Sequence, residues 1–443
     1  MFPALELNES SRVPLYRQLY DKIAESIRSG LISDGDRLPA TRELASQIGL
    51  NRTTVSAAYA LLEEDGLIKG HVGRGSFVEY RPAKATVPHS DEISFASSRP
   101  AGDQFPLAEF QATCREVTCG AQAAAILQLG SPYGYPPLRE HLLHQARSGG
   151  YAGPEDDILI CSGCQQALDL LQRVLLPAGE TVAVEDPVYH GLKNVFVRGG
   201  ARLAGVPVGS MGMAVDELAR VLAVEQPRLL VVTPSFQNPT GATLPLEARE
   251  IVVRLAREFG VTLVENDIYG ELRYHGQALA RLKTLAKLKT LDGAGTILLG
   301  SFSKVAFPGL RVGWIIAPRP LIARLAEAKQ WSDLHTDHLS QAILLRFVES
   351  GRLESHLQRV RAAGVERLEA VISACREYLP AGAEFTEPQG GMSLWVRLPE
   401  PLDAAELLPR AQRQNVDYLP GRYFSVSRHE PGALRLSFGS LSP

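Results

Sequence analysis

The sequence predicts an α/β protein in two parts, a small helical N-terminal domain with a hairpin and a large domain on a mainly parallel sheet. Its 443 residues exceed a single domain at ~100–200 residues each. Residues 81–92 contain two prolines and no apolar periodicity, which indicates a linker between residues 1–80 and 93–443. From residue 158 onward, apolar runs alternate with helical patterns, as strands and helices do around a buried parallel sheet.

The composition excludes several classes of protein. Hydrophobic residues make up 45% of the chain and charged residues 21%, as in globular rather than disordered or fibrous proteins. No stretch approaches the ~18 apolar residues of a membrane span, and the N-terminus shows no secretory signal pattern. Five cysteines suggest no disulfide framework, so we expect a cytoplasmic protein without membrane contacts. The net charge of −3 restricts any nucleic-acid binding to a local face.

Three short helices and a hairpin are predicted within residues 1–80. The first helix carries an i, i+4 apolar stripe: Leu15, Leu19, Ile23 and Ile27. The second spans Thr41–Ile48 and ends at Gly49, and Asn51 is a suitable N-cap for the third, Arg52–Asp65. The hairpin is predicted from strands at 67–69 and 76–79 around a glycine-rich tip at 70–75. This order fits a helix-turn-helix followed by a wing.

Such a unit inserts the start of its second helix into the major groove of double-stranded DNA. The predicted DNA contacts are Arg52, Thr53 and Thr54 at that helix start, Arg42 on the preceding helix, and Arg74 and Gly75 at the wing tip. The alternative is a generic helical domain with solvated arginines, because residues 1–80 hold nine Lys and Arg against eleven Asp and Glu. The three arginines nevertheless fall on the predicted DNA face. Five of the acidic residues fall at element ends away from it: Asp34, Asp36, Glu63, Glu64 and Asp65.

The large domain is predicted to contain strands at Ile158–Cys161, Thr181–Val184, Leu229–Val232, Thr262–Glu265, Ile297–Leu299 and Val312–Ile316. From about Gln330 the pattern changes to long helices and a few antiparallel-looking strands. We therefore expect a large lobe at about 125–330 and a small lobe from about 93–124 and 331–443. Ligands of open α/β sheets bind at the carboxyl ends of the strands. The residues that follow these strands are thus the first candidates for a site.

Lys304 is the centre of the predicted chemistry. A lysine amine after a strand can form a Schiff base with a carbonyl compound. Ser301, Ser303 and Arg311 lie close to it in the sequence, and hydroxyls and a guanidinium suit a phosphate. Taken alone, the motif could equally be a surface lysine in a serine-rich turn.

Four further segments supply what pyridoxal 5'-phosphate requires, each at the end of a predicted strand. Cys164 and Gln165 open a helix whose amides can bind phosphate, and Tyr189 can lay its ring on the pyridine. Asn238 offers an amide donor for the phenolic oxygen of the ring. The segment Glu265–Tyr269 carries carboxylates and a phenol, and a carboxylate at the pyridine nitrogen keeps the ring protonated as an electron sink.

Two family resemblances cover most of the chain. Residues 14–79, with Leu38–Ala45, Gly49–Val55 and Gly73–Val78, resemble a GntR-type winged helix-turn-helix. Residues ~93–443 resemble the large and small domains of a fold-type I aminotransferase. The second resemblance implies that Lys304 forms the internal aldimine and that Ser301, Ser303, Arg311, Cys164 and Gln165 bind the phosphate. It also implies that Tyr189 stacks on the cofactor ring and that Asn238 and Tyr269 bind the ring oxygen. Arg435 would hold a substrate carboxylate. The alternative for Arg435 is a solvent-facing arginine on a strand.

The chain departs from both family patterns at four positions. Ala40 stands where GntR-type domains usually have a serine helix cap, and Cys164 replaces a phosphate-binding hydroxyl. Leu129 replaces a tyrosine that often reaches a partner subunit's phosphate. The aminotransferase pattern places an aspartate three residues before Tyr269, where this chain has Asn266. Either Asn266 or Asp267 therefore faces the pyridine nitrogen. The spacing of Cys161 and Cys164 also allows a redox or zinc motif, but no second Cys/His pair lies nearby and no metal site is expected.

The combination of the two domains resembles the MocR subfamily of bacterial regulators. This implies a homodimer, arranged head-to-tail, that binds a DNA operator and senses a small amino compound or pyridoxal phosphate through an aldimine at Lys304. Two other functions stay open. The chain can be a working aminotransferase with a regulatory appendage, or a regulator that responds to pyridoxal phosphate alone.

Overall fold

The computed structural model describes residues 14–28, 32, 35–65, 67–71, 75–79, 93–288 and 295–442. The chain divides into two compact units, 1–91 and 92–443, which are described separately. The predicted contact Arg74 and the predicted linker 81–92 lie outside the described residues. Within the described part, no helix is long and apolar enough to cross a membrane.

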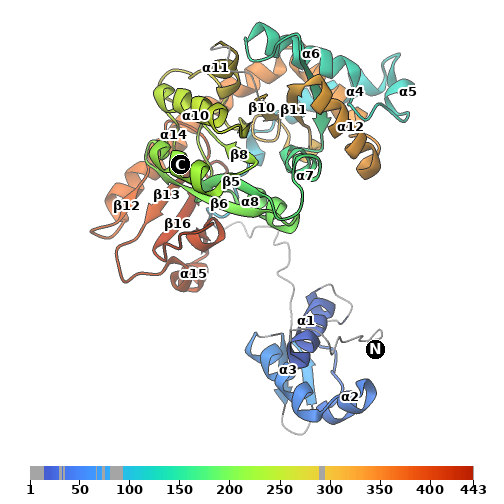
Figure 1. Cartoon of the computed structure of the whole chain (residues 1–443), viewed down its shortest axis with the longest axis vertical. Coiled ribbons are helices and arrows are strands. Elements are labelled where there is room, and N and C mark those ends of the chain that lie inside the picture. The colour runs from blue at the N-terminus through green and yellow to red at the C-terminus, as the bar shows by residue number, and fades with distance from the viewer. Residues whose placement is uncertain are drawn as a thin grey trace. The chain divides into compact units, whose positions relative to one another are not determined.

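The N-terminal unit has the predicted order of three helices and a hairpin (Figure 1). Its elements are α1 (Leu15–Arg28), α2 (Thr41–Ile48), α3 (Arg52–Glu64), β1 (Ile68–His71) and β2 (Gly75–Val78). The two strands are antiparallel, with Ile68 opposite Val78. Apolar residues from all three helices meet in one core, including Leu19, Ile23 and Ile27 of the predicted stripe together with Leu44, Val55 and Leu62. The fourth residue of the stripe, Leu15, is only half-buried and lies outside this core.

The two helices of the helix-turn-helix begin differently. Asn51 caps α3, because its side-chain oxygen accepts a hydrogen bond from the Thr53 amide at 3.1 Å. Ala40 precedes α2 and makes no side-chain cap, as its identity predicts. At the other end of α2, Gly49 adopts a left-handed conformation (φ 69°), which glycine tolerates without strain. The first turn of α2 is therefore the weaker of the two helix starts.

We predict that Ala40→Ser stabilises α2 by about 0.5–2 kcal/mol, because a serine hydroxyl can accept a hydrogen bond from an amide of the first turn. Amide hydrogen exchange in the full-length protein should show slower exchange along α2. Ala60→Ser is the control, because Ala60 is exposed within α3 and gains no cap there. Unchanged exchange in α2 would mean that another group already satisfies its first turn.

The large unit is built, within the described residues, on an eight-stranded sheet in the order β4-β11-β10-β9-β8-β5-β6-β7. In chain order the strands are β4 (Asp156–Cys161), β5 (Thr181–Asp186), β6 (Arg202–Gly209), β7 (Gly212–Met213), β8 (Leu229–Val232), β9 (Thr262–Asn266), β10 (Ile297–Ser301) and β11 (Gly313–Pro318). The pairs from β10 through β9 and β8 to β5 are parallel, as predicted, and β6, which was not predicted from the sequence, pairs in parallel with β5. The expected strand at Val312–Ile316 instead runs antiparallel to both of its neighbours, as β11.

Helices cover both faces of this sheet (Figure 1). On one face, α7 (Cys164–Leu175), α8 (His190–Arg198) and α12 (Arg319–Asp333) pack on Val182 and Val184. On the other face, α9 (Val215–Glu225), α10 (Leu246–Glu258) and α11 (Leu282–Leu288) pack on Ala183. Side chains of successive residues in one strand thus pack into the cores on opposite faces of the sheet. Both faces are buried, so these strands appear in the sequence as continuous apolar runs. A further cluster joins α6 (Pro136–Ser148) to the helices that follow α12.

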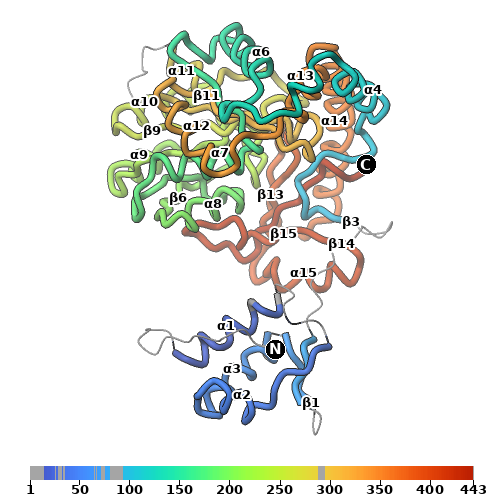
Figure 2. Tube along the Cα trace, turned by 90° about the vertical axis from the view of Figure 1, so that its right-hand side faces the viewer, coloured from blue at the N-terminus to red at the C-terminus, as the bar shows by residue number. Residues whose placement is uncertain are grey.

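The rest of the large unit forms a smaller lobe. A four-stranded sheet has the order β12-β13-β16-β15, and β3 pairs with β14 in parallel (Figure 2). These strands are β3 (Ile93–Ser94), β12 (Glu384–Phe385), β13 (Ser393–Arg397), β14 (Val416–Asp417), β15 (Leu419–Pro420) and β16 (Ala433–Ser437). The remaining helices are α4 (Leu107–Thr118), α5 (Ala123–Ile126), α13 (His338–Glu349), α14 (Arg352–Tyr378) and α15 (Ala404–Gln412). The first strand of the large unit, β3, is therefore paired with a strand near the C-terminus of the chain, β14.

Candidate functional site

A cavity of about 290 Å³ lies where the carboxyl ends of the parallel strands meet the small lobe. All the predicted cofactor residues except Asp267 line it, and so does Arg435: Cys164, Gln165, Tyr189, Asn238, Asn266, Tyr269, Ser301, Ser303, Lys304 and Arg311. The structure therefore brings together residues that are up to 271 positions apart in the chain, from Cys164 to Arg435. Of the described residues that line the cavity, three carry a positive charge and none is acidic. Such a cavity suits an anionic ligand.

One corner of the cavity has the chemistry of a phosphate site. Gly163 precedes α7 with φ 78° and lies so close to Arg311 that an added Cβ would be 2.4 Å from the guanidinium. Arg311 also donates a hydrogen bond to the Ser303 hydroxyl at 3.3 Å, and the Ser301 hydroxyl lies 3.0 Å from that of Ser303. The first amides of α7, two hydroxyls and one guanidinium thus converge, as a phosphate requires.

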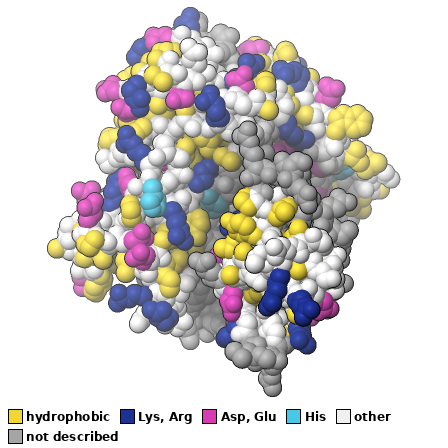
Figure 3. Space-filling view, turned by 60° about the horizontal axis from the view of Figure 1, so that its bottom comes forward, with side chains coloured by type: hydrophobic (Ala, Val, Ile, Leu, Met, Phe, Trp, Pro, Cys, Tyr) yellow, Lys and Arg dark blue, Asp and Glu magenta, His cyan; other side chains and the backbone are white. Residues whose placement is uncertain are grey.

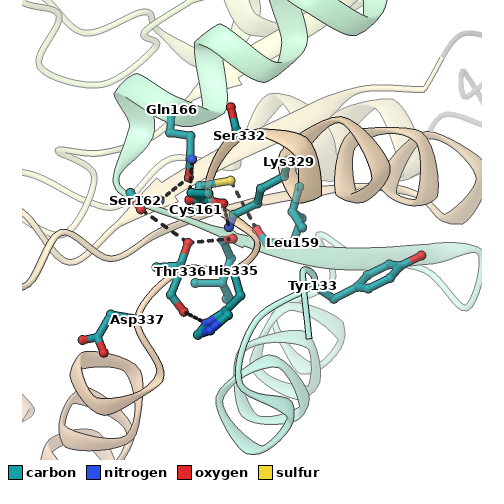
Figure 4. A network of polar contacts seen from close by, with 12 residues as sticks. Tyr133, Leu159, Cys161, Ser162, Gln166, Lys329, Ser332, His335, Thr336 and Asp337 are labelled. Carbon is teal, nitrogen blue, oxygen red and sulfur yellow. Dashed lines mark hydrogen bonds and ion pairs between the residues drawn. The ribbon is translucent and has the colours of Figure 1, made fainter. Parts of the chain in front are cut away.

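A polar network behind this corner holds the turn between β4 and α7 in place (Figure 4). The Ser162 amide donates to the side chain of Gln166 at 2.7 Å, and Gln166 donates in turn to Asp333 at 2.7 Å. Asp333 also accepts a hydrogen bond from the fully buried Lys329. The end of α12 therefore fixes the turn whose amides face the cavity.

The Lys304 side chain points into the cavity rather than to solvent. Its amine donates a hydrogen bond to the backbone carbonyl of Ser98 and lies 5.7 Å from the centre of the Tyr269 ring. The Tyr269 hydroxyl in turn accepts a hydrogen bond from Asn238 at 3.1 Å. The alternative of a surface lysine in a serine-rich turn is thus excluded by this geometry.

Arg435 is a buried cation on the small-lobe sheet. It lies on β16 between β13 and β15, and only 2% of its surface is exposed. Its guanidinium donates to the Asn238 side chain at 3.1 Å and to the carbonyl of Ala96, and it lies over the Phe424 ring. The alternative of a solvent-facing arginine is therefore wrong. Burial lowers the pKa of Arg435, since the charged form has lost its water.

The structure places Asn266 and Asp267 on opposite sides of the chain. Asn266 lines the cavity and donates a hydrogen bond to the Thr233 hydroxyl at 3.3 Å. Asp267 forms an ion pair with Arg281 at 2.7 Å and does not line the cavity. Since neighbouring side chains at a strand end point in opposite directions, only one of the two can face a bound ring. Of the two predicted candidates, Asn266 lines the cavity and Asp267 does not.

The two nearby cysteines do not form a reactive pair. Burial raises the pKa of the Cys164 thiol to about 12 and that of Cys161 further, so both are protonated at neutral pH. The Cys164 thiol donates to the Gly300 carbonyl at 3.4 Å, whereas Cys161 packs in the core on one face of the sheet. The redox and zinc alternatives have no support in this arrangement.

The predicted DNA-contacting residues lie on the helix-turn-helix of the N-terminal unit. Arg42, Arg52 and Thr53 are exposed, and Thr54 is half-buried at the start of α3. Gly75 begins β2 with φ 100°, a conformation that glycine favours. Figure 3 shows basic and acidic side chains interspersed on the face it presents, in keeping with the near-neutral charge balance.

Two comparisons with protein families agree with this division. Residues 91–443 match the model for aminotransferase class I and II, and residues 15–78 match the model for bacterial regulatory proteins of the gntR family. The chain belongs to the aminotransferase class I and II family and carries a gntR-family domain. Relatives named as HTH-type transcriptional regulators match this chain over both domains.

Individual relatives of this aminotransferase-family chain fall into two groups. It is 39% identical over 351 residues to a 2-aminoadipate transaminase of Thermus thermophilus, covering 79% of this chain and 86% of that protein. It is 28% identical over 473 residues to the probable rhizopine catabolism regulatory protein MocR of Rhizobium meliloti, covering 99% and 93%. A solved structure of LysN, an alpha-aminoadipate aminotransferase from Thermus thermophilus complexed with N-(5'-phosphopyridoxyl)-L-leucine, has a TM-score of 0.74 at 37% identity and covers 80% of this chain and 88% of that one.

Membership of the aminotransferase family implies pyridoxal phosphate as the cofactor, and most of the cavity fits it. The phosphate corner, Lys304 and the pair of Asn238 and Tyr269 are the groups that this cofactor needs. The exception is the carboxylate expected for the ring nitrogen, because Asn266 lines the cavity where the family pattern has an aspartate. Sequence reasoning also missed several lining residues: Ala96, Ser97, Ser98, Leu168, His190, Thr233 and Ile268. Ala96 and Ser98 act through backbone carbonyls, which leave no signature in the sequence.

Proposed function

We propose that this protein is a DNA-binding transcriptional regulator that senses a small amino compound in the pyridoxal phosphate pocket. Lys304 binds the cofactor, Arg435 holds a carboxylate of the effector, and the winged helix-turn-helix binds the operator. The similarity to a relative named as a regulator extends over 99% of the chain and so includes the gntR-family domain, whereas the relative named as a transaminase covers 79%.

The observation that carries the sensing role is the state of Arg435. Among the described residues, no acidic side chain forms an ion pair with it, and its Nε atom has no hydrogen-bond partner. A buried cation without a counter-ion costs free energy, so a pocket retains one where an anionic ligand supplies the missing partner. The carboxylate of an amino acid has the required charge and two acceptor oxygens.

Lys304 and Arg435 both connect the pocket to the start of the large unit. Lys304 and Arg435 each donate a hydrogen bond to the segment 96–98, which directly follows β3. A cofactor aldehyde at Lys304 and a carboxylate at Arg435 compete with the carbonyls of Ser98 and Ala96. We propose that this competition shifts the segment that continues from the predicted linker 81–92, and so changes DNA affinity. Such a shift requires the effector to bind the two arrangements with different affinity.

We further propose that the regulator acts as a head-to-tail homodimer in the cytoplasm. Several large apolar side chains of the large unit are exposed in the single chain and are candidates for burial against a second copy: Leu127, Leu129, Trp331 and Leu334. Sedimentation of the full-length protein measures its oligomeric state directly. A protein that remains monomeric at every concentration would contradict the dimer.

Arg52→Ala tests the DNA-binding half of the proposal. A side chain that reads a base edge contributes about 1–3 kcal/mol, so we expect a roughly tenfold to hundredfold loss of operator affinity. Arg17→Ala is the matched control, because Arg17 is an exposed arginine on α1 paired with Asp21. Fluorescence anisotropy at one fixed salt concentration measures both variants. Equal losses in the two variants would mean that Arg52 contributes only general charge.

The second candidate function is an active aminotransferase with a regulatory appendage. It is favoured by the presence of Lys304, Asn238, Tyr269 and Arg435 in one cavity and by the 39% identity to a relative named as a transaminase. Conversion of bound pyridoxal phosphate to pyridoxamine phosphate by amino acids, at the rates of known transaminases, would support it. A third candidate, a regulator of pyridoxal phosphate alone, predicts that the cofactor changes DNA affinity without any amine.

A further inference from the structure

We infer that Asn266 leaves the ring nitrogen of the bound cofactor unprotonated, so that the pocket captures amino compounds without efficiently transferring their amino group. This inference rests on the proposed function, because it requires pyridoxal phosphate in the cavity that contains Lys304. It concerns the chemistry of the pocket, however, and not the DNA response.

The direction of each side chain at the end of β9 fixes which group faces the cavity. Glu265 accepts hydrogen bonds from the amides of Leu282 and Lys283 at 2.9 Å, at the start of α11. Asp267 pairs with Arg281, which immediately precedes α11. Asn266, between them, points the other way and lines the cavity. The two carboxylates of this segment are therefore engaged on the α11 side.

The cavity also lacks a carboxylate that could hold a proton on the ring nitrogen. Lys304, Arg311 and Arg435 line it, and no acidic residue does within the part of the chain that the structure describes. A neighbouring negative charge favours the protonated form of a base. Without such a partner, the protonated ring nitrogen loses this stabilisation.

Glu185 is another buried carboxyl group near the site, and it does not supply the negative charge that a protonated ring nitrogen would need. It lies at the end of β5 and accepts a hydrogen bond from the Thr233 amide at 3.2 Å, while the Thr233 hydroxyl is bonded to Asn266. Burial raises the pKa of Glu185 to about 8, so this group is mostly uncharged at neutral pH.

The amide of Asn266 can serve a neutral ring. Its Oδ1 atom is buried and has no partner among the described residues, while its Nδ2 atom donates to the Thr233 hydroxyl. A primary amide has both a donor and an acceptor, and turning it over by 180° exchanges the two without changing its shape. In the turned orientation Nδ2 donates to an unprotonated ring nitrogen and Oδ1 accepts a hydrogen bond from the Thr233 hydroxyl, which satisfies every group. A carboxylate at this position offers only acceptors and would require the proton.

The consequence follows from the chemistry of the cofactor. Bound pyridoxal phosphate withdraws electrons from an attached amine most strongly when its ring nitrogen carries a proton. With Asn266 in place, Arg435 can still bind the carboxylate of an amino acid and the cofactor can still exchange Lys304 for the amino group. The ring, however, lacks the positive charge that promotes proton removal from the amino acid. A sensor benefits from this arrangement, because the effector is bound and released without being consumed.

The test is the ¹⁵N NMR resonance of the ring nitrogen in full-length protein loaded with ¹⁵N-labelled pyridoxal phosphate. We expect the wild-type resonance at the position of an unprotonated pyridine, and a large upfield displacement in Asn266→Asp. Asp267→Asn is the matched control and should leave the resonance unchanged. A protonated ring in the wild type, or a displacement in Asp267→Asn instead of Asn266→Asp, would overturn the inference.

A kinetic readout accompanies the spectrum. In the half-reaction, an amino acid and pyridoxal phosphate yield a 2-oxo acid and pyridoxamine phosphate, with no other reactant. Because one well-placed electrostatic partner changes such rates on the order of 10²–10³-fold, Asn266→Asp should accelerate the half-reaction by that factor. An Asn266→Asp rate equal to that of the wild type would contradict the inference. If the ring nitrogen is unprotonated but amino acids do not change the affinity for DNA, only the proposed function is contradicted.

Discussion

Replacing Lys304 by Ala is expected to abolish the response of DNA binding to amino compounds while leaving DNA binding itself in place. Lys304 is the amine of the cavity that can bind the cofactor covalently, and it also donates to the Ser98 carbonyl. Without it, the effector cannot exchange with a lysine, and one of the two links from the pocket to the segment 96–98 is lost, while that of Arg435 to Ala96 remains. The gntR-family domain is a separate compact unit and keeps its own core.

Lys304→Arg is the matched control for charge. Arginine keeps the positive charge but does not form the covalent bond, so we expect it to behave like the alanine variant. Operator affinity is measured with and without a set of amino acids for the wild type and both variants. A response that persists in either variant would contradict covalent sensing at Lys304.

Arg435→Gln is expected to weaken the binding of amino acids by about 30-fold or more, because loss of one partner of a buried charge pair costs about 2–5 kcal/mol. Glutamine keeps a polar side chain at this position, but it is shorter than arginine and its single amide nitrogen cannot keep both hydrogen bonds, to Asn238 and to Ala96. Binding is measured by titrating the cofactor-loaded protein and following the absorption of the cofactor.

The control for Arg435→Gln is a second ligand that lacks a carboxylate. An amine of the same length without a carboxylate has nothing to gain from the guanidinium, so Arg435→Gln should leave its affinity nearly unchanged. Equal losses for the amino acid and the amine would mean that the variant disturbs the pocket generally and that Arg435 does not recognise the carboxylate.

Much of the fold could be predicted because its signals are local. The bounds of α2 and β8 match the prediction, since a glycine end and a fully buried apolar run are explicit in the sequence. The strand β6 was missed because its residues alternate between buried and exposed near the edge of the sheet and include two glycines and a proline. The antiparallel direction of β11 could not be predicted either, because strand direction depends on pairing between distant segments.

The candidate site shows the same division. Residues that follow apolar strands, such as Asn238 and Lys304, were found because strand ends meet at one edge of the sheet. The choice between Asn266 and Asp267 required the structure, since a difference of one residue reverses the direction of the side chain. The carbonyls of Ala96 and Ser98 belong to the backbone and could not be predicted from side-chain chemistry.

The most direct test of the account is DNA binding by the full-length protein. Its affinity for the region upstream of its own gene is measured with no ligand, with pyridoxal phosphate, and with pyridoxal phosphate plus amino acids, at one stated salt concentration. The account predicts specific binding whose affinity changes when an amino acid is added to the cofactor-loaded protein. Specific binding that is indifferent to every amino acid, combined with rapid formation of pyridoxamine phosphate, would contradict it and identify an enzyme.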